Sequence, residues 1–291
     1  MKIHLAPELQ ATERGQPPKL DIYYYTDPDC SWCWATEPII KKIKEEYSGQ
    51  VRVTYKMGGL LERWEDFYDA VNQISRPEQV APHWVEVGKR SGMPIDERIW
   101  FEDPPTSTYP PCIAFKAAFF QDASMAEVYL RRLREAVLTD RRNISRENVL
   151  FELAEDVGFD MDRFREDFLT GPAQEAFYED LREARGRGIT GFPTLVIRNR
   201  LGQEITLVGY RPYSDYENAM KRLASETLHK MPLMPIVDFV RKYGHVATAE
   251  VAKVYEMDHE AALAELEKSA AAGEVVKEPK AGGEFWRPAQ T

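Results

Sequence analysis

The sequence predicts an α/β protein with one central sheet, a block of helices inserted into it and a small helical unit near the C-terminal end. Three observations support this fold class. Two strand-like runs, Leu20–Tyr25 and Val51–Met57, flank a helical pattern early in the chain. Residues 61–171 then show almost no strand pattern, and a hairpin pattern follows them. A stretch with two prolines, Met231–Pro235, sets off the last part of the chain.

The opening elements are predicted to form a parallel βαβ unit. Leu20–Tyr25 is rich in Ile and Tyr, and Val51–Met57 alternates apolar and polar residues, as half-buried strands do. Between them, Ser31–Tyr47 carries an apolar stripe at helical spacing. A connection of this length lets the two strands pair in parallel. The stripe consists of Trp34, Ile39, Ile40, Ile43 and Tyr47.

A helical insertion is predicted to follow the second strand. Its segments have the apolar periodicity and the length of ordinary helices, and Gly158 can end one of them. The predicted helices are Glu65–Ser75, Pro82–Ser91, Pro111–Gln121, Ala126–Leu138, Arg146–Val157 and Asp162–Thr170.

The sheet is predicted to be completed after the insertion. A helix over Pro172–Gly186 has a proline in its first turn, where the missing N–H costs nothing. A strand at Leu195–Ile197 turns back through residues 199–202 into a second strand at Glu204–Val208. A closing helix is predicted over Tyr213–His229.

The last part of the chain has the pattern of a winged helix. Three helices are predicted over Ile236–Tyr243, Thr248–Tyr255 and Asp258–Ala271, followed by a hairpin at 273–286. The third helix carries four acids and one lysine, which disfavours DNA binding, so we expect this unit to dock on the rest of the protein or on a protein partner. The charged residues are Asp258, Glu260, Glu265, Glu267 and Lys268, and the candidate docking residues are Leu263, Leu266, Val275, Val276, Phe285 and Trp286.

These elements divide the chain into three parts. Residues 1–18 are a polar leader, and residues 19–230 form the main domain, with its helical insertion at 61–171. Residues 235–291 form the winged-helix-like domain.

Composition restricts the function classes. The chain has 291 residues, of which 43% are hydrophobic and 30% charged, and its formal net charge is −10. This balance disfavours a nucleic-acid partner, because phosphate binding needs clustered Lys and Arg. We find no secretory signal and no run approaching the ~20 apolar residues of a membrane span, so we expect a cytoplasmic protein without membrane contact.

The strongest chemical signal is Cys30-Ser31-Trp32-Cys33, a C-x-x-C motif after a strand and at the start of a helix. Free N–H groups at a helix N-terminus favour a thiolate, so we expect the pKa of Cys30 to fall from about 8.5 to roughly 3.5–7.5. Cys30 would then attack a disulfide and Cys33 would resolve the mixed disulfide, while Ser31 and Trp32 contact the substrate.

The motif has two other interpretations, which are half of a zinc site and an inactive remnant. A zinc site needs two further ligands, and the sequence offers no second C-x-x-C and no paired histidines. We therefore expect no metal and no cofactor.

Pro193 is the second signal. In Gly191-Phe192-Pro193-Thr194 it directly precedes a predicted strand. A cis peptide bond is expected here, because cis bonds occur mainly before proline in tight turns. An ordinary trans proline at a strand start is the alternative.

The third cysteine, Cys112, follows Pro110-Pro111 at a predicted helix start. It is a possible accessory thiol. The alternative is a small buried apolar residue, which is how most free cysteines behave.

Together, the run from Thr26 to Trp34 and the later Gly191–Thr194 resemble the DsbA family of thioredoxin-fold proteins. The resemblance covers Leu20 to His229. It implies a thioredoxin fold with a helical insertion, in which Pro193 and Phe192 lie beside Cys30. These two residues would align a substrate chain through strand-like contacts.

A closer resemblance rests on Trp34-x-x-Glu37-Pro38-Ile39-Ile40-Lys41-Lys42, on residues 107–118 and on the winged-helix-like tail. These segments look like the YjbH-type adaptors, cytosolic DsbA relatives that present the regulator Spx to the ClpXP protease. They are also similar to the FrnE-like cytosolic disulfide isomerases.

The resemblance leaves more than one function open. Because both cysteines are present, the main expectation is a cytosolic thiol-disulfide oxidoreductase or isomerase that acts on protein thiols. The alternative is a protein-binding adaptor of the protease-delivery type, with a regulator or a protease as partner. A glutathione-dependent isomerase is a third and weaker expectation. The presence of Cys33 argues against it, because such enzymes do not need a resolving thiol.

Overall fold

The structure is a computed structural model that describes residues 17–70 and 72–289. Most of the predicted leader, residues 1–16, lies outside the described residues. Among the described residues, no helix combines the length and the apolar character that crossing a membrane requires.

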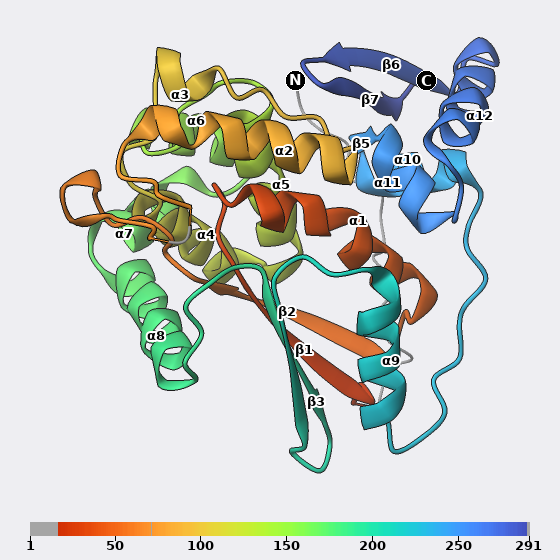
Figure 1. Ribbon diagram of the computed structural model, residues 1–291, viewed down its shortest axis with the longest axis horizontal. Helices are drawn as coiled ribbons and strands as arrows, with labels where there is room; N and C mark the ends of the chain where they lie inside the picture. Colours follow the sequence, from red (N-terminus) through yellow and green to blue (C-terminus); the bar gives the residue numbers. More distant parts are fainter. Residues whose placement is uncertain (1–16, 71, 290–291) are drawn as a thin grey trace.

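A four-stranded sheet forms the centre of the main body (Figure 1). Its strands are β1 (Leu20–Thr26), β2 (Val51–Met57), β3 (Thr194–Asn199) and β4 (Glu204–Val208), in the order β2-β1-β3-β4. β1 and β2 are parallel, and the other two pairs are antiparallel. The predicted βαβ opening and the late hairpin are therefore both confirmed.

Helices cover both faces of this sheet. Alternate residues of β1 point to opposite faces, so Ile22 and Tyr24 join the main core with α1 (Ser31–Glu46) and α9 (Tyr213–Leu223). Tyr23 and Tyr25 face the other side, where α8 (Pro172–Gly186) packs through Ala184. The fold is that of thioredoxin, with the predicted helical insertion between β2 and α8.

The insertion consists mainly of helices, as predicted. Its helices are α2 (Ala81–Ser91), α3 (Ile99–Glu102), α4 (Tyr109–Gln121), α5 (Ala123–Leu138), α6 (Glu147–Val157) and α7 (Met161–Leu169). Two 3₁₀ turns, η1 (Trp64–Asp66) and η2 (Pro77–Gln79), precede them.

The prediction of a helix over Glu65–Ser75 is wrong. After η1, Asp69 and Ile74 pair through two backbone hydrogen bonds of 2.9 and 3.1 Å. Tertiary contacts hold this segment, because the Trp64 ring lies edge-on to Trp100 and its indole N–H donates to the carbonyl of Pro105 at 2.9 Å. Local periodicity carries no information about such distant contacts.

The closing helix is shorter than predicted, since α9 ends at Leu223 and not at His229. The side-chain amide of Asn199 donates to the Leu223 carbonyl at 2.9 Å and so takes up a helix-terminal acceptor. The chain then returns to the end of α1, where the Met231 N–H donates to the Glu46 carbonyl at 2.7 Å.

The C-terminal unit contains the three predicted helices and the hairpin. The structure adds a two-residue strand, β5 (Val246–Ala247), which sequence analysis missed. It extends the hairpin of β6 (Val275–Lys280) and β7 (Gly283–Pro288) into a sheet of order β5-β7-β6. The winged-helix classification and the domain boundaries stay predictions. The elements are α10 (Ile236–Tyr243), β5 (Val246–Ala247), α11 (Thr248–Val254), α12 (His259–Ala271), β6 (Val275–Lys280) and β7 (Gly283–Pro288).

The C-terminal unit packs against α1, as Figure 1 shows on its right-hand side. Of the candidate docking residues, Phe285 joins the core of the main body, whereas Leu266, Val275 and Trp286 belong to the unit's own core. The buried carboxylate of Glu250 on α11 accepts hydrogen bonds from Lys41 at 2.6 Å and from Arg131 at 2.8 Å. The contact between the two parts is therefore both apolar and ionic.

Candidate functional site

Cys30 and Cys33 lie at the N-terminus of α1. The tight turn after β1 is closed by the Cys30 N–H, which donates to the Asp27 carbonyl at 3.3 Å. Cys30 is the N-cap residue, and its sulfur accepts the Cys33 backbone N–H at 3.2 Å. This is the predicted placement of one sulfur at the start of the helix and the other one turn along.

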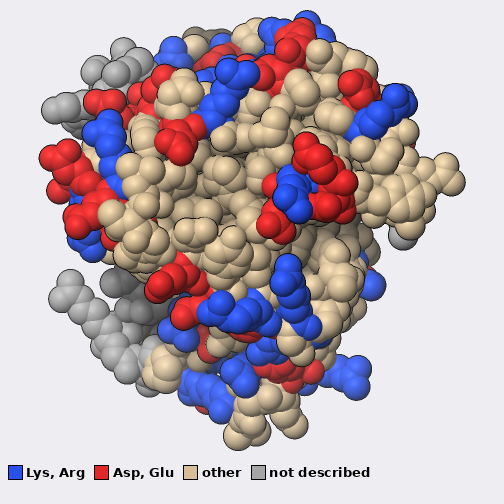
Figure 2. Space-filling view, turned by 90° about the vertical axis from the view of Figure 1, so that its left-hand side faces the viewer, with Lys and Arg blue, Asp and Glu red and all other residues tan. Residues whose placement is uncertain are grey.

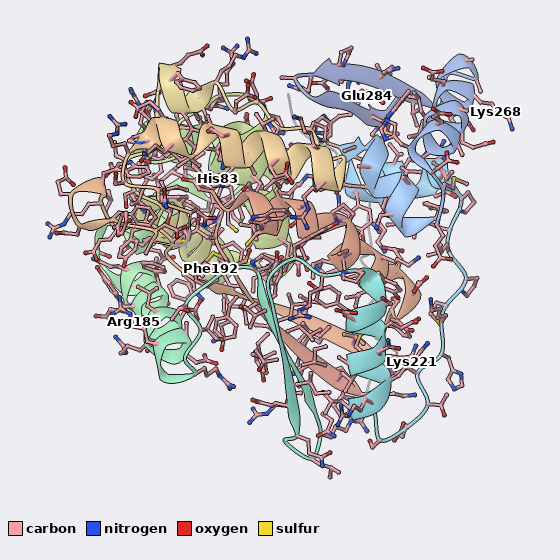
Figure 3. The ribbon with its side chains drawn as sticks, in the orientation of Figure 1. His83, Arg185, Phe192, Lys221, Lys268 and Glu284 are labelled. Carbon is pink, nitrogen blue, oxygen red and sulfur yellow. The ribbon has the colours of Figure 1, made fainter. Side chains whose placement is uncertain are left out.

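The loop before β3 brings Phe192 and Pro193 to this helix end, where Figure 3 shows Phe192 above the sheet. The Phe192–Pro193 bond is cis, as expected. The Cys30 thiol donates to the Phe192 carbonyl at 3.6 Å, and the Pro193 carbonyl accepts the Gly209 N–H at 2.8 Å. The structure therefore brings Cys30, Cys33, Phe192 and Pro193 together.

Gly58, at the end of β2, makes room for this loop. A Cβ atom there would lie 2.1 Å from the Cζ atom of Phe192, so the aromatic ring occupies the space that any other side chain would need. The glycine thus lets the ring of Phe192 lie against the backbone beside Cys30.

Both motif cysteines are free thiols and both are buried, with Cys30 6% and Cys33 0% exposed. Burial raises the pKa of the Cys30 thiol well above its ordinary value, and the hydrogen bond with Cys33 adds to this. The predicted decrease in the Cys30 pKa is contradicted. The helix N-terminus does donate to the sulfur, but removal from water outweighs that donation.

The pKa of Cys33 moves in the opposite direction because of a hydrogen bond with Cys30 and, after it, a nearby cation. Burial alone would raise the pKa of Cys33, but its hydrogen bond with Cys30 and the charge of Arg134 outweigh burial and lower it. Arg134, on α5, is itself fully buried and pairs with Glu37 of α1. The arrangement favours negative charge on the Cys33 sulfur and disfavours it on the Cys30 sulfur.

Behind the motif, the buried carboxylate of Asp27 gathers four donors. It accepts the Leu60 N–H and the Thr108 hydroxyl at 2.7 Å each and the Asp29 N–H at 2.9 Å. The Cys112 thiol donates to it at 3.5 Å. Cys112 is fully buried, and burial followed by the Asp27 charge raises the pKa of its thiol well above the ordinary value.

Asp29 is buried beside the motif without a partner for its carboxylate. Among the described residues, neither of its side-chain oxygens has a hydrogen bond. Burial, with the neighbouring Asp27, raises the pKa of Asp29 well above its usual value. Burial therefore disfavours the charged form of this carboxyl group, which lies next to Cys30 in the sequence.

A small cavity opens beside the motif. It has a volume of about 190 Å³ and is lined by Trp32, Arg90, Phe192, Gly209 and Tyr210. The guanidinium of Arg90, on α2, lies over the Trp32 ring at 5.0 Å, and the rings of Trp32 and Tyr210 are 5.5 Å apart. Ser31, the other intervening residue, is buried. Sequence analysis missed Arg90, Tyr210 and Arg134, which no local motif connects to the cysteines.

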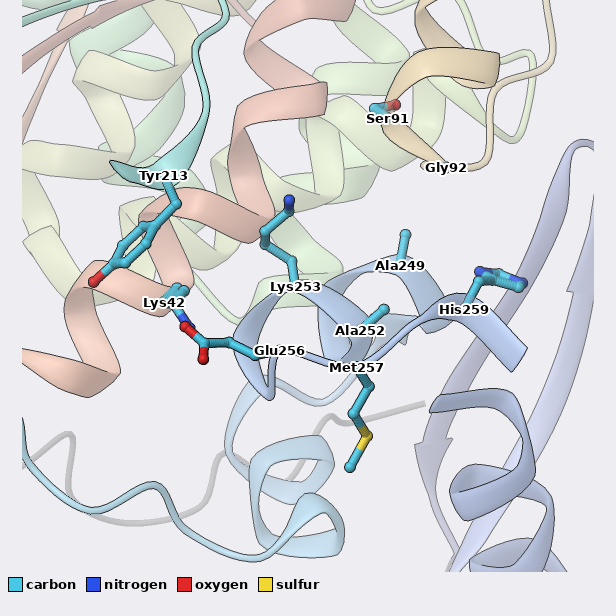
Figure 4. A pocket seen from close by; sticks show the side chains of 10 residues that line it. All are labelled: Lys42, Ser91, Gly92, Tyr213, Ala249, Ala252, Lys253, Glu256, Met257 and His259. Carbon is cyan, nitrogen blue, oxygen red and sulfur yellow. The ribbon is translucent and has the colours of Figure 1, made fainter. Parts of the chain in front are cut away.

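A larger cavity, of about 340 Å³, lies where the C-terminal unit meets the body (Figure 4). Lys42, Tyr213, Lys253, Glu256 and His259 are among its lining residues. The Lys42 ammonium is paired with Glu256 at 3.0 Å, so part of this cavity's charge is already balanced. None of the three cysteines lines it.

Sequence comparison finds matches over most of the chain. A family model described as thioredoxin matches residues 23–218. The ClpXP adapter protein SpxH of Halalkalibacterium halodurans is 32% identical over 92% of this chain and 88% of that protein. The protein of the same name from Bacillus subtilis is 30% identical over 95% of this chain and 92% of that protein.

Solved structures of disulfide enzymes match about 70% of this chain. A putative protein disulfide isomerase from Nitrosomonas europaea has a TM-score of 0.59 and 24% identity, over 70% of this chain and 97% of that one. The cytosolic disulfide reductase DsbM from Pseudomonas aeruginosa has a TM-score of 0.55 and 22% identity, over 69% of this chain and 98% of that one. At these identities the likeness is one of fold alone.

Proposed function

This chain belongs to the DsbA-like thioredoxin family, in the branch of the SpxH (YjbH-type) proteins, and from this premise we propose that it is a cytoplasmic adaptor that delivers a protein to the ClpXP protease. Spx is the proposed delivered protein. The comparisons thus favour the adaptor, which was the alternative expectation, over the oxidoreductase or isomerase.

One observation carries the proposal, and it concerns the extent of the similarity. The SpxH relatives match 92% and 95% of this chain, so their similarity includes the C-terminal unit. The disulfide-enzyme structures are almost completely matched themselves, yet they match only 70% and 69% of this chain. The SpxH relatives therefore share the C-terminal unit with this chain, in addition to the thioredoxin body.

The surroundings of the cysteines agree with a binding role. A thiol whose pKa is raised has little thiolate at neutral pH, and the thiolate is the nucleophile in disulfide exchange. The Phe192 main chain lies beside the motif at the start of β3, where a partner segment can add strand-like contacts. In this role Ser31, Trp32, Phe192 and Pro193 contact the partner.

A second surface also suits a protein partner. In Figure 2, residues that are neither acidic nor basic cover the middle of the face that forms the left-hand side of Figure 1, and Lys and Arg gather below them. α7 and α8 lie on this side and carry the exposed side chains of Leu169 and Tyr178. Exposed apolar groups with a polar border are typical of protein interfaces.

Thiol-disulfide exchange is the second candidate function, and the placement of Cys30 beside both Cys33 and Phe192 favours it. The Cys30 thiolate would attack a substrate disulfide, form a mixed disulfide and release the other substrate sulfur as a thiolate. Cys33 would then displace the substrate and leave a Cys30–Cys33 disulfide. A cellular dithiol would be needed to reduce that disulfide again.

The adaptor function can be tested with purified Bacillus subtilis Spx, ClpX and ClpP and with ATP. We expect the chain to shorten the half-life of Spx several-fold, because an adaptor raises the local concentration of its cargo at the protease. A protein carrying its own ClpXP degradation tag is the control, and its half-life should not change. An unchanged Spx half-life would contradict the proposal.

A double variant, Cys30→Ser with Cys33→Ser, separates the two candidates. An adaptor should retain most of its effect on Spx degradation, whereas an exchange enzyme should lose all reduction of a model disulfide such as insulin. If the double variant loses Spx delivery together with insulin reduction, thiol chemistry is the better description.

A further inference from the structure

The cavity beside the motif contains a cation with no acidic partner. Arg90 is exposed near the C-terminal end of α2, and among the described residues its guanidinium has no salt bridge and no hydrogen bond, although Glu86 lies one helical turn before it. Within the same part of the chain, the Tyr210 hydroxyl also has no hydrogen-bond partner. Two donors therefore border one cavity of about 190 Å³, and the described part of the chain supplies neither of them with an acceptor.

The position of Arg90 leaves its donors available. The Cζ atom of its guanidinium lies over the Trp32 ring, 5.0 Å from the ring centre, as in a cation–π contact. The N–H groups of a guanidinium project from its edge, where they match the two oxygens of a carboxylate. Trp32 thus positions the Arg90 head group at the cavity, and its N–H groups have no acceptor among the described residues.

The charge around the cavity selects an anion. Of the five residues that line the cavity, Arg90 carries a charge, three are aromatic and one is glycine. This positive site stands out in a chain whose formal net charge is −10. An acidic side chain supplies the missing charge, whereas a lysine would be repelled.

The size and location of the cavity restrict the ligand further. A volume of about 190 Å³ lies below the ~300–1,000 Å³ of ordinary small-molecule pockets, so it fits a single side chain. The lining residues Phe192 and Gly209 adjoin the sheet, and the Gly209 N–H pairs with the Pro193 carbonyl. A segment lying along this sheet end in an extended form can place one side chain in the cavity.

We propose that this cavity is a specificity pocket in which Arg90, stacked on Trp32, and the Tyr210 hydroxyl bind the side-chain carboxylate of an Asp or Glu in an extended segment of the delivered protein. The inference rests on the proposed adaptor function only for which protein carries the bound side chain. The binding chemistry itself rests on the cavity and can be tested apart from delivery.

The test uses short fluorescein-labelled peptides, rich in Val and Thr, acetylated and amidated at their ends, with Glu, Gln or Lys at the centre. By fluorescence anisotropy on the full chain, we expect the Glu peptide to bind about tenfold more tightly than the Gln peptide, with the Lys peptide weakest. Arg90→Glu should abolish the preference for Glu, and Arg90→Lys should keep part of it.

Lys89→Glu is the matched control. Lys89 is exposed, adjoins Arg90 in α2 and does not line the cavity, so this variant changes the net charge by the same amount and should keep the preference. Equal affinity of the wild type for the Glu and Gln peptides would overturn the proposal. So would a preference that survives in Arg90→Glu, or the absence of binding by all three peptides.

A further peptide, with Gln at its centre and a free C-terminal carboxylate, identifies the source of the anion. If it binds through Arg90 as tightly as the Glu peptide, the pocket recognises a chain end and the side-chain assignment is overturned. The Spx degradation assay decides delivery separately. A wild-type chain that prefers the Glu peptide but does not accelerate Spx degradation would contradict the adaptor function and keep the pocket.

Discussion

At the scale of single residues, the two motif cysteines differ in what surrounds their sulfur atoms. Cys30 contacts the Phe192 carbonyl and the Cys33 N–H, whereas Cys33 lies in the field of Arg134. Burial raises the pKa of Cys30, and the hydrogen bond with Cys30 and the Arg134 charge lower that of Cys33. The surroundings therefore disfavour the thiolate form of Cys30 and favour that of Cys33.

This difference predicts the pH dependence of alkylation. In a Cys33→Ser, Cys112→Ser variant, Cys30 should react with iodoacetamide more slowly than free cysteine at pH 7. Its rate should still be rising above pH 9, because only the thiolate reacts and the Cys30 pKa is raised. The measurement is the alkylation rate against pH by mass spectrometry. A rate that is already constant below pH 7 would refute it.

The sequence predicted the site residues that belong to local motifs and missed the others. Cys30 and Cys33 share one helix start, and Phe192 and Pro193 share one loop, so short patterns were enough to find them. Arg90 comes from the insertion and Tyr210 from the chain after β4. Only the fold brings these two residues to Trp32, and a single sequence gives no sign of that contact.

At the scale of elements, the site depends on how the end of β2 meets the loop before β3. Gly58 provides the space for the Phe192 ring. The Gly209 N–H donates to the Pro193 carbonyl and so continues the pairing of β3 with β4 up to this loop. Helices with strong apolar periodicity, such as α1 and α5, were predicted closely. The segment 65–75 was not, because contacts of Trp64 with distant residues decide its form.

A Gly58→Ala substitution tests this contact. The added Cβ would overlap the Phe192 ring, so we expect the free energy of unfolding to fall by about 1–3 kcal/mol. Displacement of the ring should also make Cys30 react faster with iodoacetamide. Gly186→Ala is the control, since nothing lies within 4 Å of its Cβ position at the end of α8. Urea denaturation that shows equal stability for both variants would count against this account.

At the scale of the whole molecule, buried charges join the C-terminal unit to the body. Glu250 of α11 is fully buried and contacts Lys41 of α1 and Arg131 of α5. Arg131 also lies over the Trp34 ring, and His245 stacks on Phe285 at 4.2 Å. The sequence indicated that this unit docks on a protein surface. It did not indicate which charged residues pair there, because the partners lie more than a hundred positions apart in the chain.

A Glu250→Gln substitution should loosen this junction. It removes the ion-pair partner of the buried Lys41 and one carboxylate partner of Arg131, which keeps Glu135, so we expect a loss of about 3–5 kcal/mol at pH 7. Burial opposes ionisation of Glu250, but Arg131 and Lys41 outweigh it and lower its pKa. The carboxylate therefore stabilises the fold above its unfolded pKa of about 4.3, and the difference from wild type should shrink as the pH falls below that value.

The measurement for Glu250→Gln is urea denaturation at several pH values, together with proteolysis of the segment between the two parts. Glu265→Gln is the control, because the Glu265–Lys268 pair on α12 is exposed and such pairs contribute little. Wild-type stability in Glu250→Gln, or a loss that grows at low pH, would show that the junction does not depend on this charge.

The packing of α1 has a consequence for the order of events during recognition. This helix is held by the sheet on one side and by α11 on another, so its first turn offers a fixed shape with little conformational entropy left to lose. A guest must then bear the ordering cost itself. In the adaptor role proposed above, such a receptor would favour a partner segment that is already extended and accessible before binding, because that segment has less conformational entropy to lose.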